Sequence, residues 1–424
     1  MRLLIKNITV VDPNSDFNNE KIDILIDGET VKKAGKSIKA DDKIKVFEGK
    51  GLFISPGWFD MQANFRDPGE EYKEDIYSGI EAAISGGFTG VALMPSTQPS
   101  VSSKSQVQYI IKKSAGVVVD VFPIGTLSVG REGNDISEMY DMHTAGAVAF
   151  SDDKRPVADS GLLTRALMYT KSFNGLIITF PEDKGMTALG MVNESAATTA
   201  LGFKGAPALA EELQLDRDLQ LAEYTQAKLH ISLISSAESA KKIKEARKKG
   251  LAVTAGVSAH HLVLNDKQLE DFDSNYKVKP PLRSEKDNQQ LIKALADGTI
   301  DVVVSDHSPE DEEHKNCEFD YASFGIIGLQ TVFPILNTYV NGKIGLEKII
   351  EKIAINPRKI LGLSIPSVKE GSKANFTIFD TKVKWTYTKE SIKSKSFNSP
   401  FIGHEFTGKA VAVINNGQFI KMTS

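Results

Sequence analysis

Cysteine is almost absent from this chain, because Cys317 is the only one among its 424 residues. A single thiol cannot form a disulfide within the chain, and this usage is typical of a reducing compartment. The sequence therefore predicts a cytoplasmic protein without a disulfide framework. Its length is enough for one large domain and a smaller one, and its hydrophobic content of 41% is enough for a sizeable core.

The chain also lacks an excess of basic residues and a long apolar run. The formal net charge is −4 and the pI is about 6.1, so nucleic acid is not expected as a partner. No run of about 18 apolar residues occurs, which argues against a membrane-spanning helix. The first apolar run is broken by Lys6 and Asn7 and does not have the features of a signal peptide.

Both ends of the chain have the residue pattern of β-strands. Residues 2–10 and 21–28 are rich in Leu, Ile and Val and are followed by Asp-Pro or end in Asp-Gly. Residues 374–380 and 410–420 have the same character, and Asn416-Gly417 predicts a hairpin turn. We therefore expect residues 1–52 and 368–424 to form one small β-sandwich around an inserted domain, residues 53–367.

Within the inserted domain, short apolar segments alternate with segments of helical pattern. The expected strands are residues 58–65, 90–94, 117–124, 147–151, 175–180, 228–234, 251–256 and 301–305. The expected helices include residues 77–85, 161–172, 213–226, 237–249 and 286–296. Eight strands with crossover helices over about 300 residues predict an α/β fold, a (β/α)8 TIM-type barrel.

Functional groups of such a barrel project from the C-terminal ends of its strands. The first expected strand ends in Gln62, Asn64 and Arg66, the fourth in Asp153 and the eighth in Asp306. Two carboxylates and one arginine are thus expected at a common mouth. Histidine, which zinc sites prefer as a nitrogen ligand, is scarce: the chain has seven, and none are spaced as His-x-His or His-x-x-x-His.

Several blocks of the sequence resemble the bacterial dihydroorotases of the amidohydrolase superfamily. The segment P-G-W-F-D-M-Q-A-N-F-R-D-P-G, residues 56–69, is similar to the first barrel strand of that family, whose pattern is P-G-x-x-D-x-H-x-H-x-R-x-P-G. The blocks G-G-F-T-G-V-A-L-M-P-S, A-F-S-D-D, K-P-P-L-R, D-G-T-I-D-V-V-V-S-D-H-S-P and G-S-K-A-N-F-T-I-F-D resemble later blocks in the same order. The resemblance covers nearly the whole chain and implies the metal-dependent hydrolase class of barrel.

In that family four histidines and two aspartates hold zinc, which activates the hydroxide that reacts with the cyclic amide. The resemblance places these six ligand positions at Gln62, Asn64, Asp153, Phe180, Leu233 and Asp306. Amide oxygens are poor zinc ligands, and Phe and Leu are not ligands at all. The resemblance therefore implies a vestigial metal site without a cofactor, in which Asp306 is a vestigial catalytic residue and the amides form hydrogen bonds.

The positions that contact substrate in the family are only partly kept. Arg66, which matches the family's arginine for the substrate carboxylate, is present, and His307 and Gly325 also match. Ser96 and Lys279 stand where the family has asparagine. A salt bridge from Arg66 to a neighbouring aspartate would explain that arginine without a ligand, and His307 would serve equally as a cap of the eighth strand.

Two buried carboxylates without a metal would repel each other and shift their pKa values upward. We therefore expect Lys279 to lie near Asp153 or Asp306 and to supply the positive charge that a metal would give. Structural ion pairs are the expected role of both aspartates.

Two functions in pyrimidine biosynthesis follow from the resemblance. The first is that of a non-catalytic partner, because some family members without the zinc ligands are structural subunits that hold aspartate carbamoyltransferase in an active assembly. The second is that of an active dihydroorotase or a related cyclic amide hydrolase, and zinc is expected as a cofactor only in this case. Since the family commonly forms dimers, a homodimer is expected.

Overall fold

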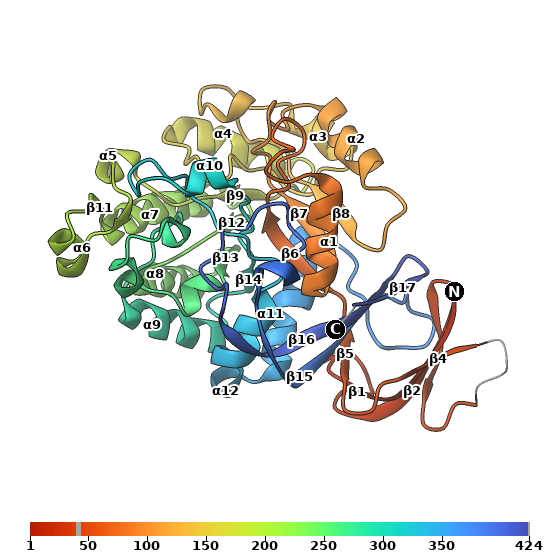
Figure 1. Cartoon of the computed structure of the whole chain (residues 1–424). Coiled ribbons are helices and arrows are strands. Elements are labelled where there is room, and N and C mark those ends of the chain that lie inside the picture. The colour runs from red at the N-terminus through yellow and green to blue at the C-terminus, as the bar shows by residue number, and fades with distance from the viewer. Residues whose placement is uncertain (40–43, 423–424) are drawn as a thin grey trace.

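The computed structural model describes residues 1–39 and 44–422 and has two parts, a barrel and a sheet built from both termini (Figure 1). The chain enters through the sheet, forms the barrel and returns to the sheet. Among the described residues, no helix combines the length and the apolar character needed to cross a membrane.

The barrel is formed by parallel strands that follow one another in chain order. They are β6 (Trp58–Ala63), β7 (Phe88–Leu93), β8 (Asp120–Pro123), β9 (Ile177–Thr179), β12 (Leu229–Ile231), β13 (Val253–Ser258) and β14 (Val302–Val304). Residues 147–151 complete the ring, because Phe150 bridges both Gly125 and Ile177. The ring closes where Asn64 donates its backbone N–H to the carbonyl of His307 at 2.8 Å.

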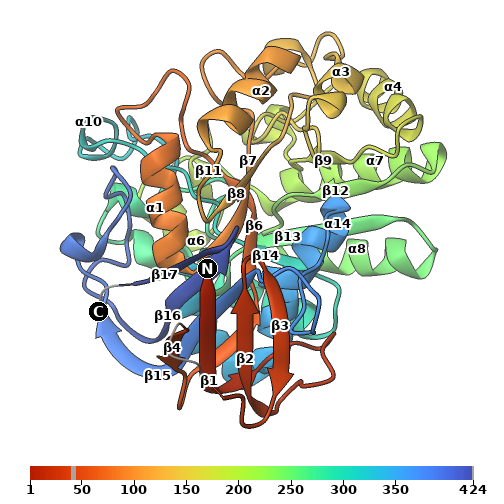
Figure 2. The same cartoon turned by 90° about the vertical axis from the view of Figure 1, so that its right-hand side faces the viewer.

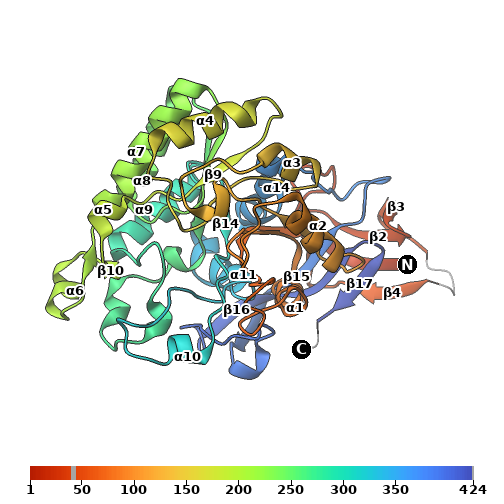
Figure 3. The same cartoon turned by 90° about the horizontal axis from the view of Figure 1, so that it is seen from above.

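The main helices lie around the outside of these strands (Figure 3). They are α1 (Ile76–Gly86), α2 (Lys104–Lys113), α4 (Ser160–Lys171), α7 (Ala208–Thr225), α8 (Ala237–Lys248) and α9 (Glu285–Ala296). Their ends carry ordinary capping signals: Asp75 accepts from the backbone N–H of Ser78, and Gly87 ends α1 at a φ of 89°. The (β/α)8 barrel predicted from the alternating pattern is thus confirmed.

Shorter elements fill the loops and the last part of the barrel. They are α3 (Met139–Thr144), α5 (Lys184–Thr187), α6 (Ala196–Ala200), α10 (Glu312–Lys315), α11 (Val332–Ile335), α12 (Asn341–Ile344), α13 (Leu346–Ile350), α14 (Asn356–Leu361) and the strand pair β10 (Val192–Asn193) and β11 (Gly205–Ala206). Two π-helical turns, Leu336–Val340 and Glu351–Ile355, continue α11 and α13.

Strands from both termini form one sheet (Figure 2). They are β1 (Arg2–Val10), β2 (Lys21–Asp27), β3 (Thr30–Gly35), β4 (Lys45–Glu48), β5 (Phe53–Pro56), β15 (Phe376–Thr386), β16 (Glu405–Asn415) and β17 (Gln418–Lys421). The order is β17-β16-β15-β5-β1-β2-β3, and β4 pairs with β1. The predicted hairpin is present: β16 and β17 are joined by Asn416 and Gly417, at φ values of 49° and 67°.

The interior of the barrel is filled by apolar side chains and is not an open channel. The buried cluster consists of Phe59, Met61, Ala92, Met94, Ile124, Ala149, Leu176, Ile178, Phe180, Leu233, Val302, Val304 and Leu361. Most of these residues come from the strands or the segments that follow them, as expected for side chains that point inward in layers. Phe180 and Leu233 thus belong to the packed core beneath the mouth of the barrel.

Candidate functional site at the C-terminal end of the barrel

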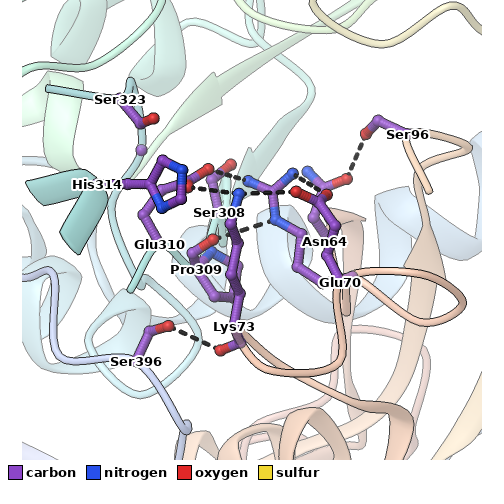
Figure 4. Close-up of polar contacts among 12 residues, drawn as sticks. Asn64, Glu70, Lys73, Ser96, Ser308, Pro309, Glu310, His314, Ser323 and Ser396 are labelled. Atoms are coloured by element: carbon purple, nitrogen blue, oxygen red, sulfur yellow. Dashed lines mark hydrogen bonds and ion pairs between the residues drawn. The ribbon is translucent and has the colours of Figure 1, made fainter. Parts of the chain in front are cut away.

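Gln62 and Asn64, at the end of β6 and just after it, are both hydrogen-bonded to neighbouring polar groups. Gln62 donates its Nε2 to Oδ1 of Asp306 at 3.3 Å. The hydroxyl of Ser96 lies 2.6 Å from Oδ1 of Asn64 and 2.5 Å from Oδ2 of Asp153, and Figure 4 shows Ser96 turned toward Asn64. The two amides and Ser96 therefore tie the two aspartates to the first and second strands.

Lys154 forms the main ion pair at this end of the barrel. Its Nζ lies 2.8 Å from Oδ1 and 2.9 Å from Oδ2 of Asp306. Burial raises the pKa of the Asp306 carboxyl from its ordinary value of 3.8 to about 6; Lys154 opposes this rise and Asp153 adds to it. The carboxylate is almost completely buried, so its ionised form needs a compensating charge close by. The ammonium of Lys154 supplies that charge.

The expectation that Lys279 would neutralise one of the aspartates is wrong. Lys279 forms an ion pair with Glu182 at 2.6 Å, and its ammonium lies 5.8 Å from the centre of the Phe180 ring. Within the described part of the chain, no ion pair joins Lys279 to Asp153 or Asp306. The physical reason is local. Lys154, which directly follows Asp153, already pairs with Asp306, whereas Lys279 lies beside Glu182 and pairs with it.

The backbone at three of these positions is in the left-handed region that non-glycine residues rarely adopt. The φ values are 58° at Arg66, 54° at Asp153 and 50° at Asp306. Such conformations cost free energy and persist where the surrounding structure holds them in place. Asp306 is held by Gln62 and Lys154, and Arg66 by acidic neighbours.

Arg66 is part of a mostly buried network of ion pairs. Its guanidinium lies 2.6 Å from Glu310 and 3.5 Å from Glu70, and its Nε donates to the carbonyl of Pro309 at 3.1 Å. Lys73 joins the same network, 2.7 Å from Glu70 and 2.9 Å from Glu310, and Figure 4 shows these side chains gathered together. Two carboxylates thus match the two cations, and neither Asp67 nor Asp306 is the partner of Arg66.

His307 is also engaged in contacts within the fold. Its Nδ1 accepts the backbone N–H of Gly328 at 3.2 Å, which leaves Nε2 to donate to Glu74 at 3.3 Å. Gly325, at a φ of 155°, has no room for a side chain, because a Cβ there would come within 2.6 Å of the Ser308 carbonyl. These contacts place both residues in the loop that follows β14.

The remaining buried histidines are neutral side chains. His230 contacts Thr254 at 2.8 Å, and burial lowers its pKa from 6.5 to about 3. Nε2 of His260 lies 4.0 Å from Asp306, and burial places the pKa of His260 well below its ordinary value. His261 bonds to Ser258 and to the Pro280 carbonyl, and burial lowers its pKa from 6.5 to about 3. None of the three supplies a positive charge to the carboxylates at neutral pH.

The residues at the six positions do not fit a zinc ion. Gln62 and Asn64 are used in hydrogen bonds, the side chains of Phe180 and Leu233 have no donor atom, and Lys154 occupies one side of the Asp306 carboxylate. Over residues 1–39 and 44–422, no group of three or more His, Cys, Asp or Glu side chains is arranged to hold a metal ion. An ammonium beside Asp306 would also repel a divalent cation.

A cleft of about 870 Å³ opens above these residues. This is within the range of small-molecule sites. Its wall carries hydroxyl groups and more cationic than anionic side chains. The charged side chains that line it are Arg66, Arg131, Lys154, Arg155, Lys279, Glu70, Asp153 and Glu310.

Sequence reasoning missed Lys154, Glu310, Glu182 and Glu74. Lys154 could have been found, since it directly follows Asp153 at a predicted strand end. The three glutamates lie in loops, and the pairing of Glu310 with Arg66 or of Glu74 with His307 joins residues more than 230 positions apart. No local pattern signals such contacts.

Comparisons with known proteins identify the family of this chain. A family model described as dihydro-orotase-like matches residues 51–239. A dihydroorotase of Geobacter metallireducens is 40% identical over 422 residues, which cover 99% of each chain. A dihydroorotase of Thermoanaerobacter sp. (strain X514) is 41% identical over 423 residues, which cover 99% of this chain and 97% of the other.

Solved structures share the fold at lower sequence identity. The L-hydantoinase (dihydropyrimidinase) from Arthrobacter aurescens superimposes with a TM-score of 0.87 at 23% identity and covers 99% of this chain and 96% of its own. Dihydropyrimidinase from Brevibacillus agri gives a TM-score of 0.85 at 24% identity, with coverage of 99% and 95%. Relatives about 40% identical over the full length show that this chain belongs to the dihydroorotase family of the amidohydrolases.

Proposed function

We propose that this protein is a non-catalytic member of the dihydroorotase family that acts as a structural or regulatory partner in pyrimidine biosynthesis. The observation that carries the proposal is the ion pair between Lys154 and Asp306, 2.8 Å apart. Lys154 gives Asp306 its compensating charge without a metal. A lysine ammonium cannot act as a Lewis acid toward a carbonyl, and it has no open coordination position for water.

The rest of the mouth supports the same conclusion. Phe180 and Leu233 fill the interior with apolar groups, and the amides of Gln62 and Asn64 are tied to neighbouring side chains. Removing the ligands for zinc while keeping a well-packed barrel is consistent with a scaffold whose role depends on its surface. The site is thus a stable set of hydrogen bonds and ion pairs.

Aspartate carbamoyltransferase is the partner that we propose, with a homodimer of this chain as the assembling unit. The experiment mixes the purified protein with the aspartate carbamoyltransferase of the same organism and measures the molar mass by light scattering after gel filtration. We expect a complex larger than either component and higher or more stable transcarbamoylase activity in it than in the transferase alone. Separate elution with unchanged transcarbamoylase activity would contradict the proposed partner.

An active cyclic amide hydrolase is the second candidate function. It is favoured by the relatives, which are named dihydroorotase and match over 97% or more of their length, and by Asp306, whose pKa of about 6 suits a general base near neutral pH. Such an enzyme would have to activate water through Asp306 and Lys154 alone. The two functions differ in one observable, the ring opening of dihydroorotate by the isolated chain.

A further inference from the structure

Two arginines in the cleft have no ion-pair partner among the described residues. Arg131 donates its Nε to the carbonyl of Asp152 at 3.1 Å, and Arg155 follows Lys154 at the end of the fourth strand segment. Both line the cleft of about 870 Å³. Among the described residues, no carboxylate oxygen lies within 4.0 Å of either guanidinium.

The other three cations of the cleft are already paired. Lys154 binds Asp306 at 2.8 Å, Lys279 binds Glu182 at 2.6 Å, and Arg66 binds Glu310 at 2.6 Å. Arg131 and Arg155 are therefore the two cations of the cleft without an ion-pair partner among the described residues. Arg66 lines the same cleft, but its guanidinium is already bound by Glu310 and Glu70.

We propose that Arg131 and Arg155 form a binding site for the phosphate or carboxylate group of a small anionic ligand. Guanidinium groups bind both oxyanions through pairs of parallel N–H···O bonds, so the shared chemistry is that of an oxyanion. The inference rests on the proposed function in one respect, namely that the cleft holds no catalytic zinc and is open to another ligand.

The surroundings of Arg131 favour an anion. Its side chain is partly withdrawn from water, and burial lowers its pKa; Asp153 and Asp152 oppose that change, while Arg155 and Arg66 add to it. Cations that lie within electrostatic reach of one another in a partly buried cleft are stabilised when an anion is placed between them. Asp153 and Asp152 supply negative charge nearby, but neither carboxylate approaches either arginine closely enough to form an ion pair.

The backbone and the hydroxyl groups of the cleft add to this site. Gly130 and Arg131 are consecutive residues in the left-handed region, at φ values of 61° and 62°, which is a costly conformation for arginine. The lining of the cleft also includes the hydroxyl-bearing residues Thr97, Ser100 and Ser323. The cleft can therefore take a ligand that combines an oxyanion with further polar groups.

The test uses the purified full-length chain and isothermal titration calorimetry at low ionic strength. The probes are inorganic pyrophosphate for a phosphate ligand and succinate for a carboxylate ligand. We expect at least one of them to bind, and the substitutions Arg131→Gln and Arg155→Gln each to weaken its binding by about tenfold or more, as expected for a lost charge-assisted pair. Preference for one probe identifies the class of oxyanion.

Arg165→Gln is the matched control, because Arg165 is an exposed arginine on α4 that does not line the cleft. The binding curve of this variant should equal that of the unchanged protein. If Arg131→Gln disturbs folding, as judged by circular dichroism, the exposed Arg155 still tests the site. Absence of binding by both probes, or binding unchanged in Arg155→Gln, would overturn the inference. Turnover of dihydroorotate would instead contradict the proposed function while leaving this binding result intact.

Discussion

A variant that carries Gln62→His, Asn64→His, Phe180→His, Leu233→His and Lys154→Ala is expected to bind zinc stoichiometrically, whereas the unchanged protein is not. Four imidazoles together with the aspartates would restore the donor set that zinc prefers. Removing Lys154 is needed because its ammonium lies 2.8 Å from a carboxylate that would become a ligand. Zinc per chain, measured by elemental analysis after dialysis, checks the result.

The control is the variant with the four histidines and an intact Lys154. In this control the Lys154 ammonium competes with zinc for Asp306. Its zinc binding should therefore be weaker than that of the five-substitution variant by about tenfold or more, because changes in groups that contact metal ligands commonly alter metal affinity by about 10–100-fold. Equal zinc affinity in both variants would show that Lys154 does not occupy the place of the metal.

The histidine variants are also expected to be less stable. Phe180 and Leu233 are 3% and 1% exposed within the apolar interior of the barrel. Replacing each with a polar ring should cost about 2–5 kcal/mol of the free energy of unfolding without metal, and zinc should recover part of it. A folded apo variant that fails to bind zinc would mean that the pocket has repacked around positions 180 and 233.

Replacing Lys154 with methionine is expected to destabilise the protein by an amount that grows with pH. The substitution keeps an apolar stem of similar length but removes the cation beside Asp306. We expect a loss of about 1 kcal/mol in the free energy of unfolding at pH 7 and about 3 kcal/mol at pH 9, with little loss at pH 5. Urea unfolding curves at the three pH values measure these differences.

The sign follows from the raised pKa of Asp306. The folded state holds the Asp306 proton up to about pH 6, whereas the unfolded state releases it near 3.8, so stability falls as pH rises through this window and then levels off. Without Lys154 the pKa of the buried Asp306 carboxyl rises further. The free energy of unfolding of the variant therefore keeps decreasing above pH 6, by about 1.4 kcal/mol per pH unit, until this carboxyl ionises. The free energies of unfolding of the unchanged protein and of Lys154→Met therefore differ only above pH 6.

Two further variants isolate this effect. Lys267→Met removes an exposed lysine whose pairing with Glu285 lies on the surface, and it should change the stability little at every pH. Adding Asp306→Asn to Lys154→Met should abolish the growth of the loss with pH, because the carboxyl that titrates is gone. A pH-independent loss in Lys154→Met would contradict the assigned ion pair.

The fold could be predicted from the sequence because its signals are local. Alternating apolar segments and helical patterns indicated the strands and helices of the barrel, and Asn416-Gly417 indicated the last hairpin. Residues 147–151 form fewer regular bridges than expected, although Phe150 pairs with both neighbouring segments. The domain limits after residue 52 and before residue 368 remain predictions, while β5 (Phe53–Pro56) pairs with the strands of the terminal sheet.

The site could be predicted only in part because its contacts join distant segments. The geometry of a barrel, in which strand ends meet, predicted that the two amides lie near the two aspartates. In the structure Gln62 contacts Asp306, and Asn64 is linked to Asp153 through Ser96. The choice between Lys154 and Lys279 as the partner of an aspartate depends on side-chain reach and on Glu182, which no periodicity encodes. The pairing of Arg66 with Glu310 likewise depends on how the loop after β14 folds back.

Under the proposed function, this member of the dihydroorotase family neither holds zinc nor opens the dihydroorotate ring. The most direct test incubates the purified chain with zinc, removes the excess, and measures zinc content and dihydroorotate ring opening on the same sample. We predict far less than one zinc per chain and a rate equal to that of a protein-free control. One zinc per chain together with sustained ring opening would contradict the account.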